Sequence, residues 1–454
     1  MDEYITKDEN ENKTIIFSYF YNKPLDYDLI SSYKKIIFSD YDLNTNLFDN
    51  YNNLFDNHNV KFNDSVIKCS MFNHPVDDLH NGLTHLIFGH NFYQYVDNLP
   101  CSLTHLIFGY WFNKQVDELP DGLTHLIFGN NFNRSVDNLP RSLIYLVFGN
   151  NFNQSVDNLP CSLTYLVIGF YFNKPVNNLM IMSLTHLELG YNCTKSISKL
   201  PFSLVYLKFG SYFNESFDNF AKNLIHLKYL IFGHYFNQPV NFLENDLMYL
   251  TFGDNFNQEV DSLSINLLHL TLGANFNCPV NNLPQKLTHL IVGYHFNCPV
   301  NNLPQKLTHL ILGYCFNCPL NNLPQKLTHL ILGYCFNCPL NNLPCSITNI
   351  KLECGSQYII DSLNDGIEKL EFGFCFNGIL SNIPTSVKKI IFDKNSQFDG
   401  ELNCLPKFVK LIQLPKKYNI KISNIPIELK KIICSKNYPY ISDLILNDIC
   451  VETY

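Results

Sequence analysis

Residues Pro284–Leu343 read PQKLTHLIVGYHFNCPVNNL, PQKLTHLILGYCFNCPLNNL and PQKLTHLILGYCFNCPLNNL, three copies of one repeat of which the last two are identical. The period is 20 residues, as the spacing of Gly293, Gly313 and Gly333 shows. Tandem repeats of this length are typical of solenoids, in which each repeat packs only against its neighbours. This stretch therefore predicts a solenoid for the chain around it.

The same pattern, L-x-x-L-x-F/L-G-x-x-F-N-x-x-V-x-x-L-P, extends over nearly the whole sequence. Its glycine recurs at Gly89, Gly109, Gly129, Gly149, Gly169, Gly190, Gly210, Gly233, Gly253 and Gly273. A degenerate copy at Ile15–Leu25 aligns with Leu106–Val116, and the apolar anchor persists at Ile390, Leu411 and Ile432. One repeat per anchor gives about 21 repeats, so we predict one solenoid rather than several globular domains.

Three regions differ in how well they keep the pattern. Residues 1–70 hold degenerate repeats, an expected cap and an Asn/Asp-rich insertion near Asn46–Asn57. Residues 71–344 hold the regular array, and residues 345–454 hold degenerate repeats and a second expected cap. Caps are expected because the end repeats of a solenoid would otherwise expose its core.

The repeat that contains Leu106 shows what each copy should form. Alternation places Leu106 and Phe108 on one face of a short strand and His105 and Ile107 on the other. The glycine that follows ends the strand where there is little room for a side chain. We therefore predict a β-rich repeat solenoid with one short parallel strand per repeat of about 20 residues.

Two more columns should run along the solenoid. An internal phenylalanine stack is expected at Phe112, Phe132, Phe152, Phe172, Phe256, Phe276, Phe296, Phe316 and Phe336. The residue after each phenylalanine is asparagine, and these asparagines should form an amide ladder that satisfies backbone groups in the turn.

Composition excludes several classes of protein. Charged residues make up 16% of the chain and the net charge is -8, which does not indicate a nucleic-acid partner. The polar start MDEYITKDENENK lacks the features of a secretory signal, and no apolar run reaches membrane-spanning length. We expect an intracellular, cytoplasmic protein without membrane contact, whose 16 cysteines are thiols.

The sequence resembles the FNIP repeat family, through the signature L-x-x-L-x-F-G-x-x-F-N-x-P-V that is strongest from about Met71 to Pro344. The resemblance implies a leucine-rich-repeat-like coil. It also implies an origin among giant DNA viruses or social amoebae. A viral member would be a viral protein of the host cytoplasm. Some relatives carry an N-terminal F-box, which would imply a substrate receptor of a ubiquitin ligase. Residues 1–60 of this chain show no leucine-rich helical F-box pattern.

The position before the buried strand leucine is the main candidate for a binding site. It holds His85, His105, His125, Tyr145, Tyr165, His186, Tyr206, Tyr229, Tyr249, His269, His289, His309 and His329, and then Asn349, Lys369, Lys389, Lys410 and Lys431. An apolar column beside it is expected to face outward, at Ile87, Ile107, Ile127, Val147, Val167, Ile291, Ile311 and Ile331. An exposed apolar and aromatic stripe indicates a protein partner, whereas stacked identical side chains can also serve only to stabilise strands.

The cysteines and histidines are also candidates for a metal site. Cys315, Cys318, Cys335 and Cys338 have zinc-site spacing, but the second pair exists because the repeat was duplicated. The histidines should point in parallel rather than converge on a metal. Walker, G-x-G-x-x-G, G-x-S-x-G and H-E-x-x-H motifs are absent, so we expect neither an enzyme nor a cofactor.

These observations predict a non-enzymatic scaffold whose strand face binds a protein partner. The binding residues would be His85, His105, His125, Tyr145, Tyr165, His269, His289, His309 and His329. Two alternatives remain open at this point: a ligase receptor without a recognisable F-box, and a structural protein that self-associates through the same face.

Overall fold

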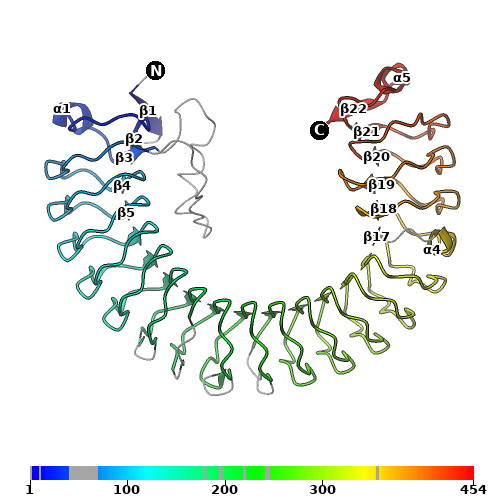
Figure 1. The fold of residues 1–454 in the computed structure, drawn as a ribbon, viewed down its shortest axis with the longest axis horizontal. Helices are drawn as coiled ribbons and strands as arrows, with labels where there is room; N and C mark the ends of the chain where they lie inside the picture. The colour runs from blue at the N-terminus through cyan, green and yellow to red at the C-terminus, as the bar shows by residue number, and fades with distance from the viewer. Residues whose placement is uncertain are drawn as a thin grey trace. The chain divides into compact units, whose positions relative to one another are not determined.

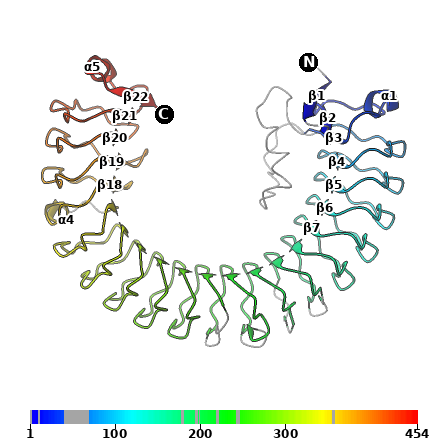
Figure 2. The same cartoon turned by 180° about the vertical axis from the view of Figure 1, so that it is seen from behind.

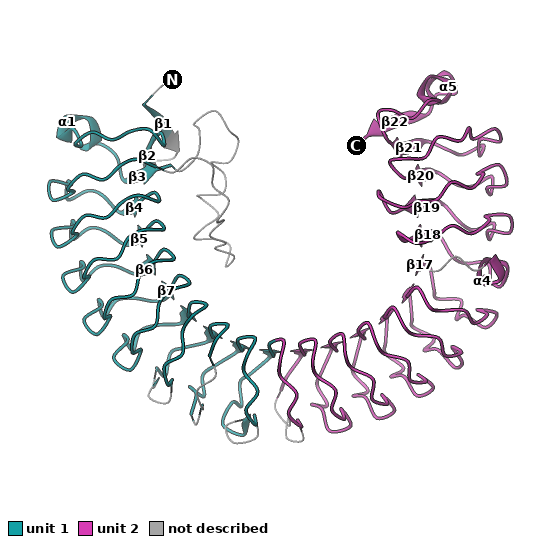
Figure 3. Cartoon of the chain, viewed as in Figure 1, with its two compact units in different colours: residues 1–233 teal, residues 234–454 magenta. Residues whose placement is uncertain are grey.

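A computed structural model describes residues 3–9, 12–39, 70–176, 179, 181–193, 197, 199–217, 221–240, 246–353 and 357–454. The Asn/Asp-rich insertion at Asn46–Asn57 lies outside these residues. The chain forms a parallel-strand β-solenoid that divides into two compact units, residues 1–233 and residues 234–454 (Figure 3). The separate division into array, degenerate repeats and caps stays a prediction.

Unit 1 contains the first eleven strands and one short helix of the described chain. The strands are β1 (Tyr4–Glu9), β2 (Asn12–Phe17), β3 (Lys35–Phe38), β4 (His85–Ile87), β5 (His105–Ile107), β6 (His125–Ile127), β7 (Tyr145–Val147), β8 (Tyr165–Val167), β9 (His186–Glu188), β10 (Tyr206–Lys208) and β11 (Tyr229–Ile231). The helix α1 (Tyr27–Ile30) lies in the return path between β2 and β3.

Unit 2 continues the same arrangement. Its strands are β12 (Tyr249–Thr251), β13 (His269–Thr271), β14 (His289–Ile291), β15 (His309–Leu312), β16 (His329–Leu332), β17 (Asn349–Leu352), β18 (Lys369–Phe372), β19 (Lys389–Phe392), β20 (Leu411–Gln413), β21 (Lys431–Cys434) and β22 (Cys450–Thr453). Short helices α4 (Gln357–Asp361) and α5 (Ile441–Leu446) replace turns in two return paths.

Successive coils pair their strands in parallel and without slip. His289 lies opposite His309, and His309 lies opposite His329. Within each unit the strands of successive coils lie side by side and the return paths lie away from them (Figures 1 and 2). This register aligns each sequence column into a column in space, as the period predicted.

The expected phenylalanine stack fills the coil interior. Phe316 is fully buried, with ring centroids 6.0 Å from Phe296 and 6.1 Å from Phe336. A second ring from the strand packs against the stack in many coils, as where Phe108 lies 3.7 Å from Phe112. Aromatic stacking therefore links the interiors of successive coils, beside the buried leucines of each coil.

The expected asparagine ladder is also present. The backbone amide of Asn317 donates to Oδ1 of Asn297 over 2.8 Å, and the amide of Asn337 donates to Oδ1 of Asn317 over the same distance. The ladder continues in unit 1, where Asn153 donates to Oδ1 of Asn133. Each side chain thus satisfies a turn amide of the next coil.

The glycine that ends each strand is required by the neighbouring coil. A Cβ atom on Gly313 would lie 1.8 Å from the carbonyl oxygen of Gly293. No side chain atom fits at that distance, so the predicted lack of room is confirmed. Glu353 occupies the same column one coil after Gly333, beyond the regular glycine run.

One sequence-based assignment was wrong. The strand at β20 has Ile412 as its buried anchor and places Leu411, not Lys410, opposite Lys389 and Lys431. Two extra residues separate Ile390 from Ile412 relative to the usual period, which displaced the alignment by one position. Outside the repeat pattern, β1 pairs antiparallel with β2.

Candidate interaction surface

Four histidines on β13 to β16 form a continuous stack on the strand face of unit 2, and we call it the imidazole column: His269, His289, His309 and His329. The ring centroids of adjacent members lie 4.1 to 4.2 Å apart. The stack begins on Tyr249, whose ring lies 4.3 Å from that of His269. All four histidines are half-buried, with their backbones fixed by the sheet.

Three of these histidine rings contact the hydroxyl group of a neighbouring threonine. Oγ1 of Thr308 lies 2.9 Å from Nδ1 of His309, and the same contact joins Thr288 to His289 and Thr328 to His329. His269 follows Leu268 instead and has no such neighbour. The sequence signal for these contacts is the T-H pair, which recurs in many but not all repeats and was not recognised in the sequence analysis.

Burial favours the uncharged form of His269, His289 and His309. The pKa of His289 is lowered from 6.5 to about 4, first by burial and then by the like charge that His269, His309 and His329 would carry. Burial likewise lowers the pKa of His269 and of His309. At neutral pH the strand face therefore presents neutral imidazole rings.

We expect unit 2 to lose stability as the pH falls from about 6.5 towards 4. Below pH 6.5 the unfolded chain binds protons on His269, His289 and His309 more readily than the folded column, in which the pKa of each of these three is lowered, so protonation favours unfolding. Thermal unfolding of the whole chain at pH 7, 6, 5 and 4 measures the effect. Replacing His269, His289 and His309 with asparagine, the residue that occupies the same column at Asn349, should flatten the dependence in this window, and an unchanged profile would contradict the assignment.

The corresponding column of unit 1 is more enclosed. His85, His105 and His125 are half-buried, but only 6% of Tyr145 and of Tyr165 is exposed. Their rings stack as in unit 2, with His85 and His105 4.1 Å apart. The structure thus brings all nine predicted residues into strand-face columns, five in unit 1 and four in unit 2.

The expected outward apolar column is wrong for much of unit 1. Ile87, Ile107 and Ile127 are at most 4% exposed, and Val147 is 6% exposed. They pack into one cluster with Ile16, Ile37, Tyr145 and Tyr165, and Ile5 of β1 packs against that cluster. In unit 2 the expectation holds better, because Ile291 is 36% exposed and Ile311 and Ile331 are half-buried.

A tyrosine ladder flanks the strand face of unit 2. Tyr294, Tyr314 and Tyr334 are each between 37% and 45% exposed, and their ring centroids lie 4.5 and 5.1 Å apart. A shallow hollow of about 350 Å³ lies beside the ladder, lined by Leu312, Gly313, Tyr314, Ile331, Gly333, Tyr334, Glu353 and Cys375. The outward side of β13 to β16 is consequently aromatic and apolar, and it carries no charged side chain.

Charged side chains occur again on the outward face from β17 onward. Lys351 pairs with Glu353 and Lys369 pairs with Glu371, each at 2.5 Å, and Lys431 pairs with Glu452. The predicted lysine column is therefore largely neutralised by carboxylates on the same face. The uncharged stretch of β13 to β16 ends where these ion pairs begin.

The four cysteines with zinc-site spacing do not converge. Sγ of Cys318 and of Cys338 donates to the asparagine ladder, while Cys315 lies 3.9 Å from Nδ1 of His295. Within the described ranges, no three His, Cys, Asp or Glu side chains are placed to hold a metal ion.

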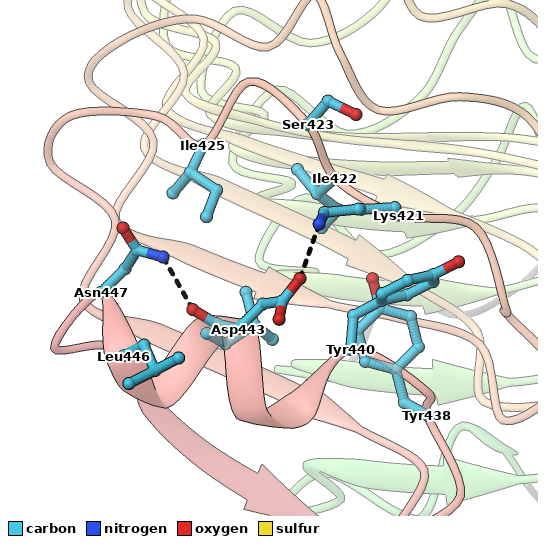
Figure 4. Close-up of a pocket in the computed structure, with 10 residues that line it drawn as sticks. Lys421, Ile422, Ser423, Ile425, Tyr438, Tyr440, Asp443, Leu446 and Asn447 are labelled. Atoms are coloured by element: carbon cyan, nitrogen blue, oxygen red, sulfur yellow. Dashed lines mark hydrogen bonds and ion pairs between the residues drawn. The ribbon is translucent and has the colours of Figure 1, made fainter.

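A second hollow lies at the C-terminal end of unit 2 (Figure 4). Its volume is about 320 Å³, and Lys421 and Asp443 form an ion pair of 2.7 Å on its wall. This pair raises the pKa of Lys421, so the ammonium is a poor base. Asn447 donates to the backbone oxygen of Asp443 and closes the helix end, which makes the hollow part of the terminal packing.

The FNIP Repeat family matches the chain eight times. The matched residues are 72–111, 95–130, 112–151, 132–171, 256–295, 279–315, 297–335 and 316–355. The chain carries FNIP repeats at residues 72–171 and 256–355. The matches fall within both units, and the second group contains every strand of the imidazole column.

Solved structures resemble this FNIP repeat chain to different degrees. "The crystal structure of CroV588 a novel circular LRR protein structure" is 28% identical, covers 85% of this chain and 84% of its own, and has a TM-score of 0.42. YopM from Yersinia enterocolitica WA-314 is 17% identical over 78% of this chain and 73% of its own, with a TM-score of 0.40. No curated protein matches the FNIP repeat chain.

The FNIP repeat chain is thus a repeat solenoid with family matches in both of its compact units. None of the helices in the described ranges is both long enough and apolar enough to cross a bilayer.

Proposed function

We propose that the FNIP repeat chain is a non-enzymatic scaffold that binds a protein partner through its strand face. The observation that carries the proposal is the outward side of β13 to β16, where the imidazole column, Ile291 and the tyrosine ladder form an accessible surface without charge. Aromatic enrichment and depletion of charge mark the cores of protein interfaces. The column of unit 1 belongs to the same proposal, with less accessible rings.

The shape of the surface favours a macromolecular partner over a small substrate. Its hollow of about 350 Å³ is shallow and lies beside an open ladder of tyrosines, whereas small-molecule sites enclose most of their ligand. The three coils of β14 to β16 repeat the same outward residues, so a partner can make equivalent contacts along several strands. Binding sites of this kind gain affinity from area and a few aromatic anchors.

The test compares two variants of the full chain in capture of partners from the native cell. The first carries His289→Glu, His309→Glu and His329→Glu, which place three charges on the strand face. The second carries Asn301→Glu, Asn321→Glu and Asn341→Glu, which place three charges on exposed turns of neighbouring coils.

We expect the first variant to lose a specific partner and the second to retain it, because a buried unpaired carboxylate in an interface costs several kcal/mol, or about 100-fold or more in affinity. Circular dichroism establishes that both variants are folded. Equal capture by both variants and the wild type would refute the strand face as the binding surface.

A further inference from the structure

The threonines assign the proton on three rings of the imidazole column. Oγ1 of Thr308 lies 3.1 Å from the carbonyl oxygen of Thr288 and 2.9 Å from Nδ1 of His309. A carbonyl oxygen can only accept, so the hydroxyl satisfies this contact by donating its one hydrogen to it. Oγ1 is then the acceptor for His309, and Nδ1 must carry the ring proton.

The opposite assignment places two acceptor oxygen atoms against each other, although the Thr288 carbonyl also accepts from the backbone amides of Thr308 and His309. If the hydroxyl donated to Nδ1, two oxygen atoms would face each other at 3.1 Å with no hydrogen between them. The same pair of contacts recurs at Thr288, whose Oγ1 lies 3.0 Å from the Leu268 carbonyl, and at Thr328. Three successive rings therefore carry the proton on Nδ1 and a lone pair on Nε2.

A separate observation at the end of the column agrees with this assignment. Nδ2 of Asn349 lies 2.6 Å from Nε2 of His329. The amide nitrogen is a donor, so Nε2 has to be the acceptor. The chain thus already contains one side-chain amide that donates a hydrogen bond to an Nε2 lone pair of the imidazole column.

Nε2 of His289 and of His309 receives no hydrogen bond from any residue in the described ranges. We infer that these acceptors bind side-chain amides, of asparagine or glutamine, on an extended segment of a protein partner. The inference rests on the proposed function and specifies the chemistry of the partner. Amides fit better than cations because β13 to β16 carry no outward carboxylate to compensate a buried charge. A neutral ring likewise gives a carboxylate no attraction.

The first arm of the experiment reads the proton directly by ¹⁵N nuclear magnetic resonance of the histidine rings in the full chain at pH 7.5. We expect His289, His309 and His329 to have protonated Nδ1, and His269, which lacks the threonine, to show the tautomer mixture of a solvated ring. The variant Thr308→Val should shift His309 alone towards that mixture. Protonated Nε2 on His289 and His309 would overturn the inference while leaving the proposed function intact.

The second arm uses a displayed library of random dodecapeptides as the probe. The counter-selection protein carries His289→Phe, His309→Phe and His329→Phe, which keep a stack of rings at positions that tyrosine fills elsewhere in the column and remove Nε2. We expect peptides that depend on the histidines to be enriched in asparagine and glutamine. Their binding should weaken by roughly 2- to 5-fold for Thr308→Val, because only the fraction of His309 with its proton on Nδ1 can then accept their hydrogen bond.

Each other outcome of the selection decides against the inference. Histidine-dependent enrichment of lysine, arginine, aspartate or glutamate would overturn the amide chemistry and retain the strand face as a binding surface. Peptides that bind the wild type and the phenylalanine variant equally would show that binding does not depend on a hydrogen bond to Nε2. Absence of any peptide whose binding His289→Glu, His309→Glu and His329→Glu abolish would refute the proposed function together with the inference.

Discussion

Replacing Gly313 with alanine should destabilise unit 2 by about 3 kcal/mol or more. The added Cβ would lie 1.8 Å from the carbonyl oxygen and 2.4 Å from the carbonyl carbon of Gly293, and backbone atoms of a neighbouring coil cannot rotate away as a side chain can. The two coils would have to separate, which weakens the sheet and the asparagine ladder together. Urea unfolding followed by circular dichroism measures the loss.

Gly373→Ala is the matched control, because it makes the same substitution in the same column of the same unit. The three atoms closest to its Cβ would all belong to the carboxylate end of Glu353, a side chain that can turn aside. That movement disturbs an exposed ion pair with Lys351, which contributes little. We expect a change within about 1 kcal/mol, and equal losses for the two variants would contradict the close-contact explanation.

Truncating Phe316 to alanine should cost about 3 to 5 kcal/mol. The ring is fully buried between Phe296 and Phe336, and backbone hydrogen bonds on both sides prevent the coils from closing over the cavity. The midpoint of urea unfolding should fall accordingly. Phe316→Leu, which refills much of the space, should recover a large part of the loss.

Tyr314→Ala separates the effect of burial from that of ring stacking. Tyr314 lies in the same turn and stacks on Tyr294 at 4.5 Å, but it is 37% exposed. Its removal leaves no internal cavity, so a loss of about 1 kcal/mol is expected. If Tyr314→Ala cost as much as Phe316→Ala, stacking rather than core packing would hold the coils together.

The regular array could be predicted from the sequence because one rule fixes every coil. Once Gly293, Gly313 and Gly333 share a column, the strand, the phenylalanine stack and the asparagine ladder follow from the 20-residue period. Where the period changes, the prediction fails. The displaced assignment at Lys410 and Leu411 arose from two extra residues, and the antiparallel β1 has no counterpart elsewhere in the chain with which to align.

Only part of the candidate surface could be predicted from the sequence. The period placed the histidines together, but it could not show that Ile107 is enclosed in one unit while Ile291 is exposed in the other, since both occupy the same repeat position. The proton positions on the rings also needed coordinates. They depend on distances between Thr308, its histidine neighbour and the preceding coil, which a pattern of letters does not contain.

The repetition of identical contacts from coil to coil has a genetic consequence. Residues 304–323 and 324–343 have the same sequence, and each meets its neighbours through the same Phe, Asn and His columns. A gene that gains or loses one such segment by unequal recombination would encode a chain in which every surviving junction is already compatible. The length of the strand face can therefore change in steps of one strand spacing, about 4.8 Å, without any new packing having to evolve.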